Sequence, residues 1–296
     1  SGAVGYGGGD FFAGNDAVVF CDRSGRLYSK PYAAGLPKAL TPEFGGCAAP
    51  VLSPDGSFVV FVHTYEGRDL LACVPSNGSE WPVILKQGAD FYMQPTLSPD
   101  GSLLAWVEWD HPNMPWDGSR LMLAVLSEDR KNLKAVKQIA GDALVATFQP
   151  TFSPDGSKLA WLQNSAEFDD LQILDLGNDS RQTLLENQNL LPPAWVQGIR
   201  TLSWAPDGRS IYYLLNQQGS LNLQKIDLTT SQVSTISTDN FSLIEQLTGS
   251  PDGRLAFTGQ SACQPPRIAL LKDGQIHTIA RSASDVLNEQ DFSVPQ

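Results

Sequence analysis

One short turn sequence recurs along the whole chain, and it limits the folds that these 296 residues can adopt. Ser53-Pro54-Asp55-Gly56 returns at 98–101, 153–156 and 250–253, and with alanine in its first place at 205–208. Proline presets φ for the first central position of a turn, aspartate bonds to the local backbone, and glycine accepts a positive φ. Each copy therefore predicts a tight hairpin, and successive copies start 45 to 55 residues apart.

The segments between these turns have the composition of strands. An apolar run rich in β-branched and aromatic residues follows each turn, as in 57–62 (SFVVFV) and 157–162 (SKLAWL), and two further apolar segments precede the next copy. Residues 13–16 (AGND) stand in for the turn in an additional, first unit. Repeats of this length, made of short strands, are typical of β-propeller blades.

The repeat therefore predicts an all-β fold, a six-bladed β-propeller of four-stranded antiparallel blades. A β-sandwich could use the same strands, but it would not naturally repeat one turn five times in the same place. Helices would have to tolerate five Pro-Asp-Gly breakers. We expect the propeller over residues 1–284 and a linker over 285–296. The expected blades cover about 10–40, 48–86, 94–140, 147–186, 200–237 and 245–280.

The acidic composition narrows the possible partners. Lysine and arginine number 20 against 32 aspartate and glutamate residues, so the formal charge is −12. A nucleic-acid surface needs a basic stripe instead, so we expect neither nucleic acid nor an anionic membrane as a partner. No apolar run approaches the roughly 18 residues of a membrane span, and the first residues lack a signal-peptide pattern. The four cysteines show no CxxC spacing, so a cytoplasmic location is the default and a periplasmic one stays open.

The chain offers few residues for catalysis. Its nearest approach to a G-x-S-x-G nucleophile elbow is 259–263 (GQSAC), which ends in cysteine and does not lie between a strand and a helix. The oxygens of Asp110, Asn113 and Asp117 could in principle gather around calcium, but their spacing matches no EF-hand. We expect no catalytic residue, no metal and no cofactor. No pair of the three histidines, His63, His111 and His277, has metal-ligand spacing, and His63 and His277 are better explained as surface or packing residues than as catalysts.

One connection stands apart from the repeat. Residues 109–118 (WDHPNMPWDG) join the second and third strands of the third blade, so they belong on the face opposite the Pro-Asp-Gly turns. The prolines lower the entropy of the unfolded loop, while Trp109 and Trp116 offer amphipathic area that suits an interface. Packing of these rings over a neighbouring blade edge is the alternative, and residue types do not decide between the two. The longest and most aromatic connections share this face: 45–50, 86–95, 141–150 and 186–200.

The same loop carries a family resemblance. Residues 109–118 resemble the signature of bacterial dipeptidyl aminopeptidase/acylaminoacyl-peptidase-like enzymes, a subgroup of the prolyl oligopeptidase-family (S9) serine peptidases. Residues 88–92 (GADFY) are similar to that group as well, and residues 6–9 (YGGG) resemble its EYGGG segment, with Gly5 in place of the glutamate. Residues 288–292 (NEQDF) resemble its linker into a hydrolase domain. The turn repeats alone are also shared with TolB-type propellers.

The resemblance implies a serine peptidase in which the propeller screens peptides before an α/β-hydrolase domain. No position here matches the family's nucleophile, histidine or acid, so the chain itself is expected to be non-catalytic and its parent protein a peptidase. The expected partners are the hydrolase domain of the same parent chain and peptide substrates. Six residues are predicted to face them: Tyr92, Trp109, His111, Asn113, Trp116 and Asp117.

Two other functions stay open at this point. A self-standing TolB-like propeller that binds proteins is the main alternative to the peptidase domain. A propeller lyase or lactonase with a metal in its channel is disfavoured, because the chain has three histidines and no clustered channel carboxylates in its sequence.

Overall fold

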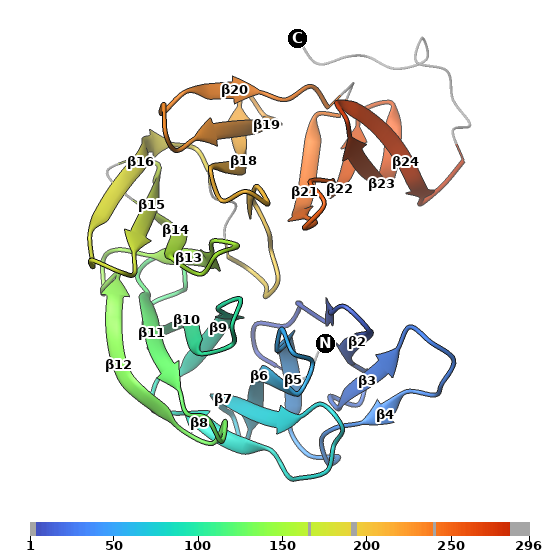
Figure 1. Ribbon diagram of the computed structural model, residues 1–296, viewed down its shortest axis with the longest axis vertical. Coiled ribbons are helices and arrows are strands. Elements are labelled where there is room, and N and C mark those ends of the chain that lie inside the picture. The colour runs from blue at the N-terminus through green and yellow to red at the C-terminus, as the bar shows by residue number, and fades with distance from the viewer. Residues whose placement is uncertain (1–3, 165–166, 191–193, 239–240, 285–296) are drawn as a thin grey trace.

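The fold is a β-propeller, as the turn repeat predicts. The computed structural model describes residues 4–164, 167–190, 194–238 and 241–284. These described residues form 24 strands in six four-stranded antiparallel sheets, arranged around a central axis in Figure 1. The predicted six blades of four strands are therefore confirmed. The linker expected at 285–296 lies outside the described residues.

Each blade uses four strands that are consecutive in the chain and pair in sequence order. The first blade contains β1 (Phe11–Ala13), β2 (Ala17–Cys21), β3 (Leu27–Pro31) and β4 (Lys38–Ala39). The second contains β5 (Gly46–Leu52), β6 (Phe58–Tyr65), β7 (Arg68–Pro75) and β8 (Val83–Lys86). The third contains β9 (Phe91–Leu97), β10 (Leu103–Trp109), β11 (Arg120–Leu126) and β12 (Leu133–Ala140). The fourth contains β13 (Thr147–Phe152), β14 (Lys158–Asn164), β15 (Asp169–Asp175) and β16 (Arg181–Gln188). The fifth contains β17 (Leu202–Trp204), β18 (Ser210–Gln217), β19 (Ser220–Asp227) and β20 (Val233–Thr235). The sixth contains β21 (Leu243–Gly249), β22 (Leu255–Ser261), β23 (Gln264–Lys272) and β24 (Gln275–Arg281).

The Pro-Asp-Gly turns connect the first and second strands of blades two to six. In the third blade, Gly101 N donates to Ser98 O at 2.8 Å, and Ser98 Oγ donates to Asp100 Oδ1 at 2.5 Å. Leu103 N donates back to Ser98 Oγ at 2.9 Å, which closes the hairpin. Gly101 has φ +71°, a value that L side chains rarely adopt. The turn residues therefore satisfy one another within six positions.

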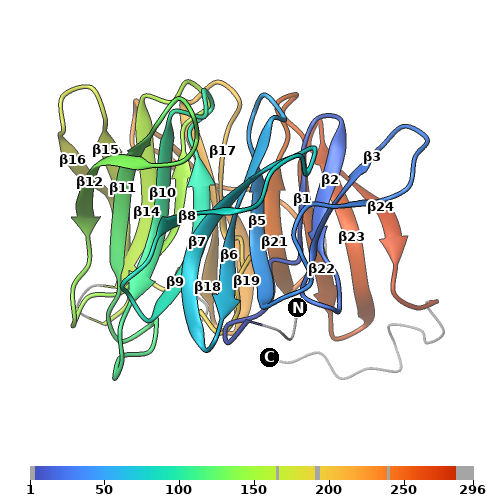
Figure 2. The same cartoon turned by 90° about the horizontal axis from the view of Figure 1, so that it is seen from below.

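Neighbouring turns also touch one another. A Cβ placed on Gly101 would lie 3.5 Å from Pro54 Cδ, and one on Gly156 would lie 3.4 Å from Pro99 Cδ. The turns therefore lie side by side on one side of the disc, which we call the turn face. The connections between second and third strands, and between blades, form the opposite side, which we call the loop face. Figure 2 shows the strands running between the two sides.

The core lies between neighbouring blades. Trp106 and Val107 are consecutive in β10 and both are buried, because one packs toward the second blade and the other toward the fourth. Trp106 shares a cluster with Val60 and Val62 of β6, and Val107 shares one with Leu162 of β14. Since both sides of an inner blade are covered, its strands read as continuous apolar runs instead of alternating ones.

The arrangement of blades in Figure 1 is an arc. The sheets of β1–β4 and β21–β24 are its two ends and do not lie side by side in that view. Each of these end blades packs against one neighbour: Val19 clusters with Phe61 of the second blade, and Phe257 clusters with Leu214 of the fifth.

Candidate contact site on the loop face

The loop between β10 and β11 has a defined conformation of its own. Asn113 N donates to Asp110 O at 3.1 Å and Asp117 N donates to Met114 O at 3.0 Å, so two successive turns build it. The Asp117 carboxylate accepts from Met114 N at 3.0 Å. Asn113 Nδ2 donates to Ala143 O at 2.7 Å, which fixes the loop to the connection between β12 and β13. The predicted residues Asn113 and Asp117 therefore hold the loop in place.

A pair of aspartates joins this loop to the segment before β9. Asp90 N donates to Asp110 Oδ1 at 3.0 Å, and His111 N donates to Asp90 Oδ2 at 2.9 Å. The two residues are 20 positions apart, and each carboxylate caps a backbone N–H of the other segment. The two sequences that carried the family resemblance, 88–92 and 109–118, are thus in direct contact.

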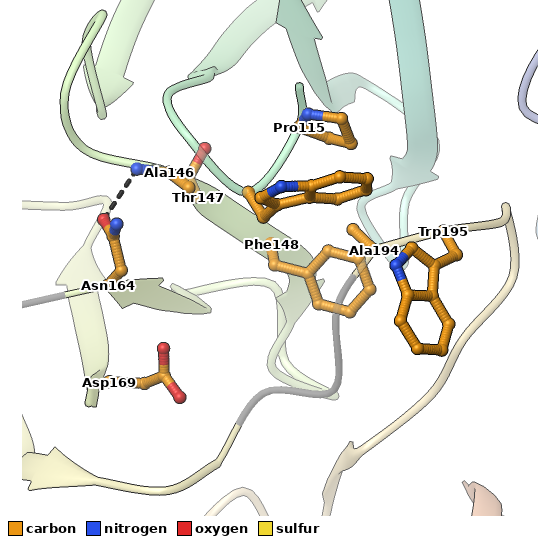
Figure 3. A pocket seen from close by; sticks show the side chains of 9 residues that line it. Pro115, Ala146, Thr147, Phe148, Asn164, Asp169, Ala194 and Trp195 are labelled. Atoms are coloured by element: carbon orange, nitrogen blue, oxygen red, sulfur yellow. Dashed lines mark hydrogen bonds between the residues drawn. The ribbon is translucent and has the colours of Figure 1, made fainter. Parts of the chain in front are cut away.

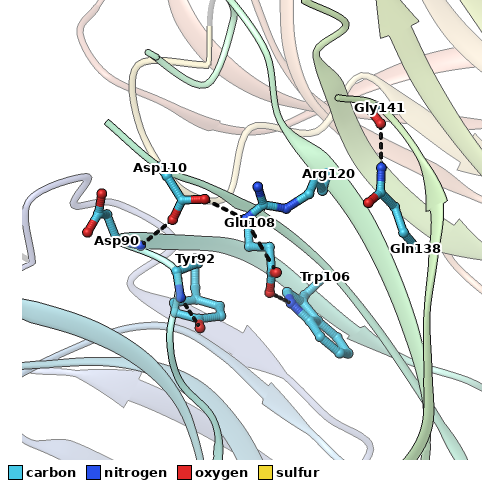
Figure 4. Close-up of polar contacts among 9 residues, drawn as sticks. Asp90, Tyr92, Trp106, Glu108, Asp110, Arg120, Gln138 and Gly141 are labelled. Atoms are coloured by element: carbon cyan, nitrogen blue, oxygen red, sulfur yellow. Dashed lines mark hydrogen bonds and ion pairs between the residues drawn. The ribbon is translucent and has the colours of Figure 1, made fainter. Parts of the chain in front are cut away.

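Arg120 anchors the beginning of the loop from β11, as Figure 4 shows. Its guanidinium lies 2.8 Å from Asp110 Oδ2 and 3.6 Å from Glu108 Oε1, and Trp106 Nε1 donates to Glu108 Oε2 at 2.7 Å. Burial alone would raise the pKa of Asp110, but the hydrogen bonds from Arg120 and from Asp90 N outweigh it and hold that pKa below its usual value. Asp110 therefore stays ionised at neutral pH and keeps both segments fixed.

Four rings from three chain segments pack together beneath the loop. The Phe91 ring stacks on Trp109 at 5.1 Å between centroids, and His111 meets Phe91 edge-on at 4.9 Å. Tyr6 contacts both Phe91 and Trp109 edge-on, at 5.3 and 5.0 Å. The Tyr6 hydroxyl donates to Met114 Sδ at 3.2 Å. Burial and the nearby Asp117 carboxylate raise the pKa of Tyr6, so the hydroxyl remains a donor at neutral pH.

Two of the six predicted contact residues lie in the core instead of at the surface. Trp109 is 1% exposed and Tyr92 is fully buried. The Tyr92 hydroxyl accepts from Ala89 N at 3.1 Å, and burial raises its pKa. Trp109 ends β10 and Tyr92 is the second residue of β9, and neighbouring segments cover both, so these rings support the loop and do not themselves offer contact area. This differs from the expectation that all six face a partner.

Three of the predicted residues are exposed: His111, Trp116 and Asp117. Trp116, which is 38% exposed, lies beside a cavity of about 340 Å³ on the loop face. Figure 3 shows Phe148 and Trp195 on its aromatic side and Asn164 and Asp169 on its polar side. The cavity is lined by Pro115, Trp116, Ala146, Thr147, Phe148, Asn164, Asp169, Ala194 and Trp195. The loop therefore contributes one wall of a cavity whose other walls come from the fourth blade and the connection to the fifth.

The glycine-rich amino-terminal segment belongs to the same side of the molecule, which sequence reasoning missed. Gln197 N donates to Gly7 O at 2.8 Å, and Gly8 forms a parallel bridge with Gln197. Gly198 has φ +75°, and a Cβ there would lie 2.5 Å from Gly9 Cα. Glycine is needed at 8, 9 and 198 because each has a positive φ and two backbone segments approach closely there.

A chain of glutamines holds the connection between β16 and β17 against the inner strands. Gln94 N donates to Gln197 Oε1 at 3.1 Å, and Gln149 N donates to Gln94 Oε1 at 2.6 Å. Gln149 Oε1 in turn accepts from Thr201 N at 2.6 Å. A signal existed in the sequence: Ala49, Gln94, Gln149 and Gln246 each stand four places before the serine of a turn. All four are bulged residues with positive φ.

Within the described ranges, no three His, Cys, Asp or Glu side chains come together in a way that could hold a metal ion. The residues of the near-miss elbow, Gly259 to Ser261, belong to strand β22, where no strand-to-helix turn exists to present a nucleophile. The part of the chain that the structure describes also has no helix long and apolar enough to cross a membrane.

Comparisons with known proteins agree with this architecture. The family model described as TolB beta propeller domain matches residues 77–286. The chain therefore belongs to the TolB β-propeller domain family.

The solved structures similar to this chain include peptidases. A puromycin-hydrolyzing peptidase of Mycobacterium tuberculosis superposes with a TM-score of 0.86 over 98% of this chain and 48% of that one, at 23% identity. A puromycin hydrolase superposes with a TM-score of 0.81 over 93% of this chain and 45% of that one, at 26% identity. Dipeptidyl-peptidase 5 of Porphyromonas gingivalis is 28% identical over 93 residues, which are 30% of this chain and 13% of that protein.

These similarities confirm the resemblance to the propeller of prolyl oligopeptidase-family peptidases. The chain spans about half the length of the solved peptidases that it matches.

Proposed function

We propose that this chain is the non-catalytic propeller domain of a prolyl oligopeptidase-like serine peptidase and that it shapes the access of peptides to a hydrolase domain of the same parent protein. The similarity to puromycin-hydrolyzing peptidases, which extends over nearly all of this chain but less than half of theirs, is the observation that supports it. The loop face would be the side turned toward the hydrolase, because the segments that resemble the peptidase subgroup gather there.

The geometry of the loop suits a rim that contacts small substrates. Three ties fix it, through Asp90, Arg120 and Ala143, so its exposed side chains keep their positions without a partner. A preorganised rim loses little conformational entropy when a peptide binds. A rigid rim would not widen to admit a folded protein, whereas an extended peptide would need no such widening. His111 and Trp116 would supply the contacts, and Tyr92 and Trp109 would support them from below.

The replacement Trp116→Ala in the full-length parent protein tests this proposal. We expect KM for short peptides to rise several-fold with kcat little changed, because the ring would bind substrate and transition state alike. Trp81→Ala is the matched control: Trp81 is 71% exposed, lies between β7 and β8, stacks on Phe44 and does not line the cavity beside Trp116. Peptide kinetics that stay the same in both variants would contradict a role of the loop in substrate access.

A protein-binding module is the second candidate, and the match to the TolB β-propeller family favours it. The complete reading frame separates the two. A downstream G-x-S-x-G followed by aspartate and histidine supports the peptidase, because those are the hydrolase residues that this chain lacks. A stop codon directly after Gln296 supports the independent module and would overturn the peptidase proposal.

A further inference from the structure

We propose that Arg200 binds the free carboxyl end of a short peptide, near the central axis on the loop face. The inference deepens the proposed function, on which its biological role rests, because it names the end of the substrate that the propeller would hold. The binding itself can be measured on the present chain without a hydrolase domain.

Arg200 lies where the connection between β16 and β17 reaches the inner strands. It comes just before β17, the first strand of its blade, and the first strands lie nearest the central axis, as β5, β9, β13 and β21 do in Figure 1. Gln94 Nε2 of the third blade donates to Ile199 O at 3.2 Å. Leu247 N of the sixth blade donates to Arg200 O at 3.0 Å. The backbone at this position is therefore held between blades on both sides of the axis.

The Arg200 guanidinium has no counter-ion within the described ranges. No carboxylate there forms an ion pair with it, although the chain carries a formal charge of −12. Its Nε is buried and has no hydrogen-bond partner among those residues, while the side chain as a whole is half-buried. Burial lowers the pKa of Arg200, and no neighbouring carboxylate opposes this effect. A buried cation without a partner is costly, so Arg200 indicates a binding site for an anion.

A second polar atom without a partner belongs to the adjoining segment. Gln246 is the residue before Leu247, in the bulge of β21, where its φ is +59°. Its Oε1 is buried and accepts no hydrogen bond from the part of the chain that the structure describes. The bond from Leu247 N to Arg200 O holds the two segments together. Two neighbouring segments at the centre of the loop face thus offer an unpaired donor and an unpaired acceptor.

The carboxyl end of a peptide carries the two complementary groups. Its carboxylate can accept from the guanidinium in a charge-assisted hydrogen bond, which is about twice as strong as a neutral one. The amide N–H of the last residue can donate to Gln246 Oε1, whereas a phosphate ion has no N–H to offer. The amino end of a peptide is cationic and is repelled by Arg200. Because Arg200 is only half-exposed, a chain end reaches it more easily than a residue in the middle of a peptide.

Titration of the chain with N-acetyl-dialanine tests the site. The readout is the Arg200 Nε–H signal in NMR spectra of the 15N-labelled chain, and we expect a saturable shift. The carboxamide of the same compound, which differs only at the carboxyl end, should bind at least about tenfold more weakly. Equal binding of acid and carboxamide would overturn the proposal.

Two further probes distinguish the source of the anion. The α-amide of N-acetyl-aspartate carries its carboxylate on the side chain, and inorganic phosphate carries no peptide group. Both should bind more weakly than N-acetyl-dialanine. Tighter binding of either probe would assign Arg200 to acidic side chains or to free anions and would overturn the assignment to the carboxyl end.

The variant Arg200→Met separates binding from folding. It should weaken binding of the acid at least about tenfold. It should also raise the melting temperature of the chain by about 2–4 °C, because it removes an unpaired buried charge and keeps a side chain of similar length. A lower melting temperature would show a structural role and overturn the proposal. Arg209→Met is the matched control, since Arg209 is exposed on the turn face of the same blade, and neither quantity should change. Gln246→Ala should weaken binding several-fold at an unchanged melting temperature.

A carboxylate of the hydrolase domain is the alternative partner of Arg200. In that case Arg200→Met would destabilise the full-length parent protein while it stabilises the present chain, and this pair of results would overturn the proposal. The outcome for the proposed function is separate. If the acid binds through Arg200 while peptide kinetics of the parent ignore Trp116→Ala, the carboxylate site stands and the proposed function fails. If Trp116→Ala raises KM while acid and carboxamide bind equally, only the carboxylate site fails.

Discussion

The two sides of this propeller are held together by different kinds of contact. On the turn face, Ser98, Asp100 and Gly101 satisfy one another within a few residues, and the same set returns in other blades. On the loop face, local turns are joined by contacts between residues 20 to 108 positions apart, such as Asp90 with Asp110 and Tyr6 with Met114. The turn face repeats the same turn in several blades, whereas the loop face has one assembly of segments that are distant in the chain.

This difference suits the turn face to supporting the fold and the loop face to carrying a specific binding surface. Local turns can be copied from blade to blade, because each needs only its own residues. A surface assembled from distant segments can vary in one blade without disturbing the others, which is why binding sites concentrate on loops carried by a rigid scaffold. We therefore expect substitutions on the loop face to have unequal effects, set by burial and long-range partners, and substitutions in the turns to have similar, smaller ones.

The largest expected effect concerns the two tryptophans of the 109–118 loop. Trp109→Ala should lower the free energy of unfolding by about 3–5 kcal/mol, because it removes a buried ring that Tyr6 and Phe91 contact. Trp116→Ala should lower it by less than about 1 kcal/mol, since that ring is partly exposed. Urea unfolding followed by circular dichroism measures both. Equal losses would show that the loop does not divide into a supporting and a contacting part.

Glycine substitutions compare the backbone of the two faces. Gly141→Ala should cost about 3 kcal/mol, because φ is +78° and the new Cβ would overlap Ser119 O as well. Gly56→Ala in a turn should cost about 1–2 kcal/mol, since φ is +71° but nothing lies within 4 Å. Thermal unfolding of the two variants side by side gives the ranking. A larger loss for the turn variant would contradict the closer backbone packing on the loop face.

The bulged glutamines provide an internal comparison. Gln149→Ala should cost about 2 kcal/mol, because Thr201 N and Leu202 N lose a buried acceptor. Gln246 stands at the same place in the sixth blade, with a similar φ of +59°, but its Oε1 has no hydrogen-bond partner among the described residues. Gln246→Ala should therefore be nearly neutral. Denaturant titrations give the free energy of unfolding of both variants. A large loss for Gln246→Ala would contradict the conclusion that the hydrogen bonds of the Gln149 side chain cause the difference.

The smallest effect is the response of the turns to acid. Hydrogen bonds from Ser153 and Ser157 lower the pKa of Asp155 to about 2, below the value of about 3.9 in an unfolded chain. Its stabilisation is therefore fully present above about pH 4 and is lost as the pH falls through 2. Because the carboxylate is exposed, the contribution is small. Melting temperatures from pH 5 to pH 2 should fall slightly less steeply for Asp155→Asn than for the unchanged chain. A steeper fall in the variant would contradict a stabilising contribution from the ionised Asp155 carboxylate.

Much of the fold was readable in advance, because its determinants are local. Proline, aspartate and glycine specify a turn at each recurrence, and the apolar runs that follow specify strands that are covered on both sides. The aspartate pair could not be read in this way, since nothing near Asp90 in the sequence indicates that its partner is Asp110. The burial of Tyr92 and Trp109 was missed for a related reason: an aromatic ring at the end of a strand is exposed or covered according to what the other segments do.

The sequence by itself determined the number of blades, the four strands of each and the turn that joins the first two. It also identified the loop 109–118 as the place where the repeat is broken. Only the tertiary structure decided which rings of that loop are buried, that Tyr6 and the glycines after it contact the same side, and that Trp116, Phe148, Trp195 and Asp169 surround one cavity. The physical reason is range: turn geometry depends on neighbours in the chain, whereas the shape and charge of a binding surface depend on side chains that meet only when the blades are packed.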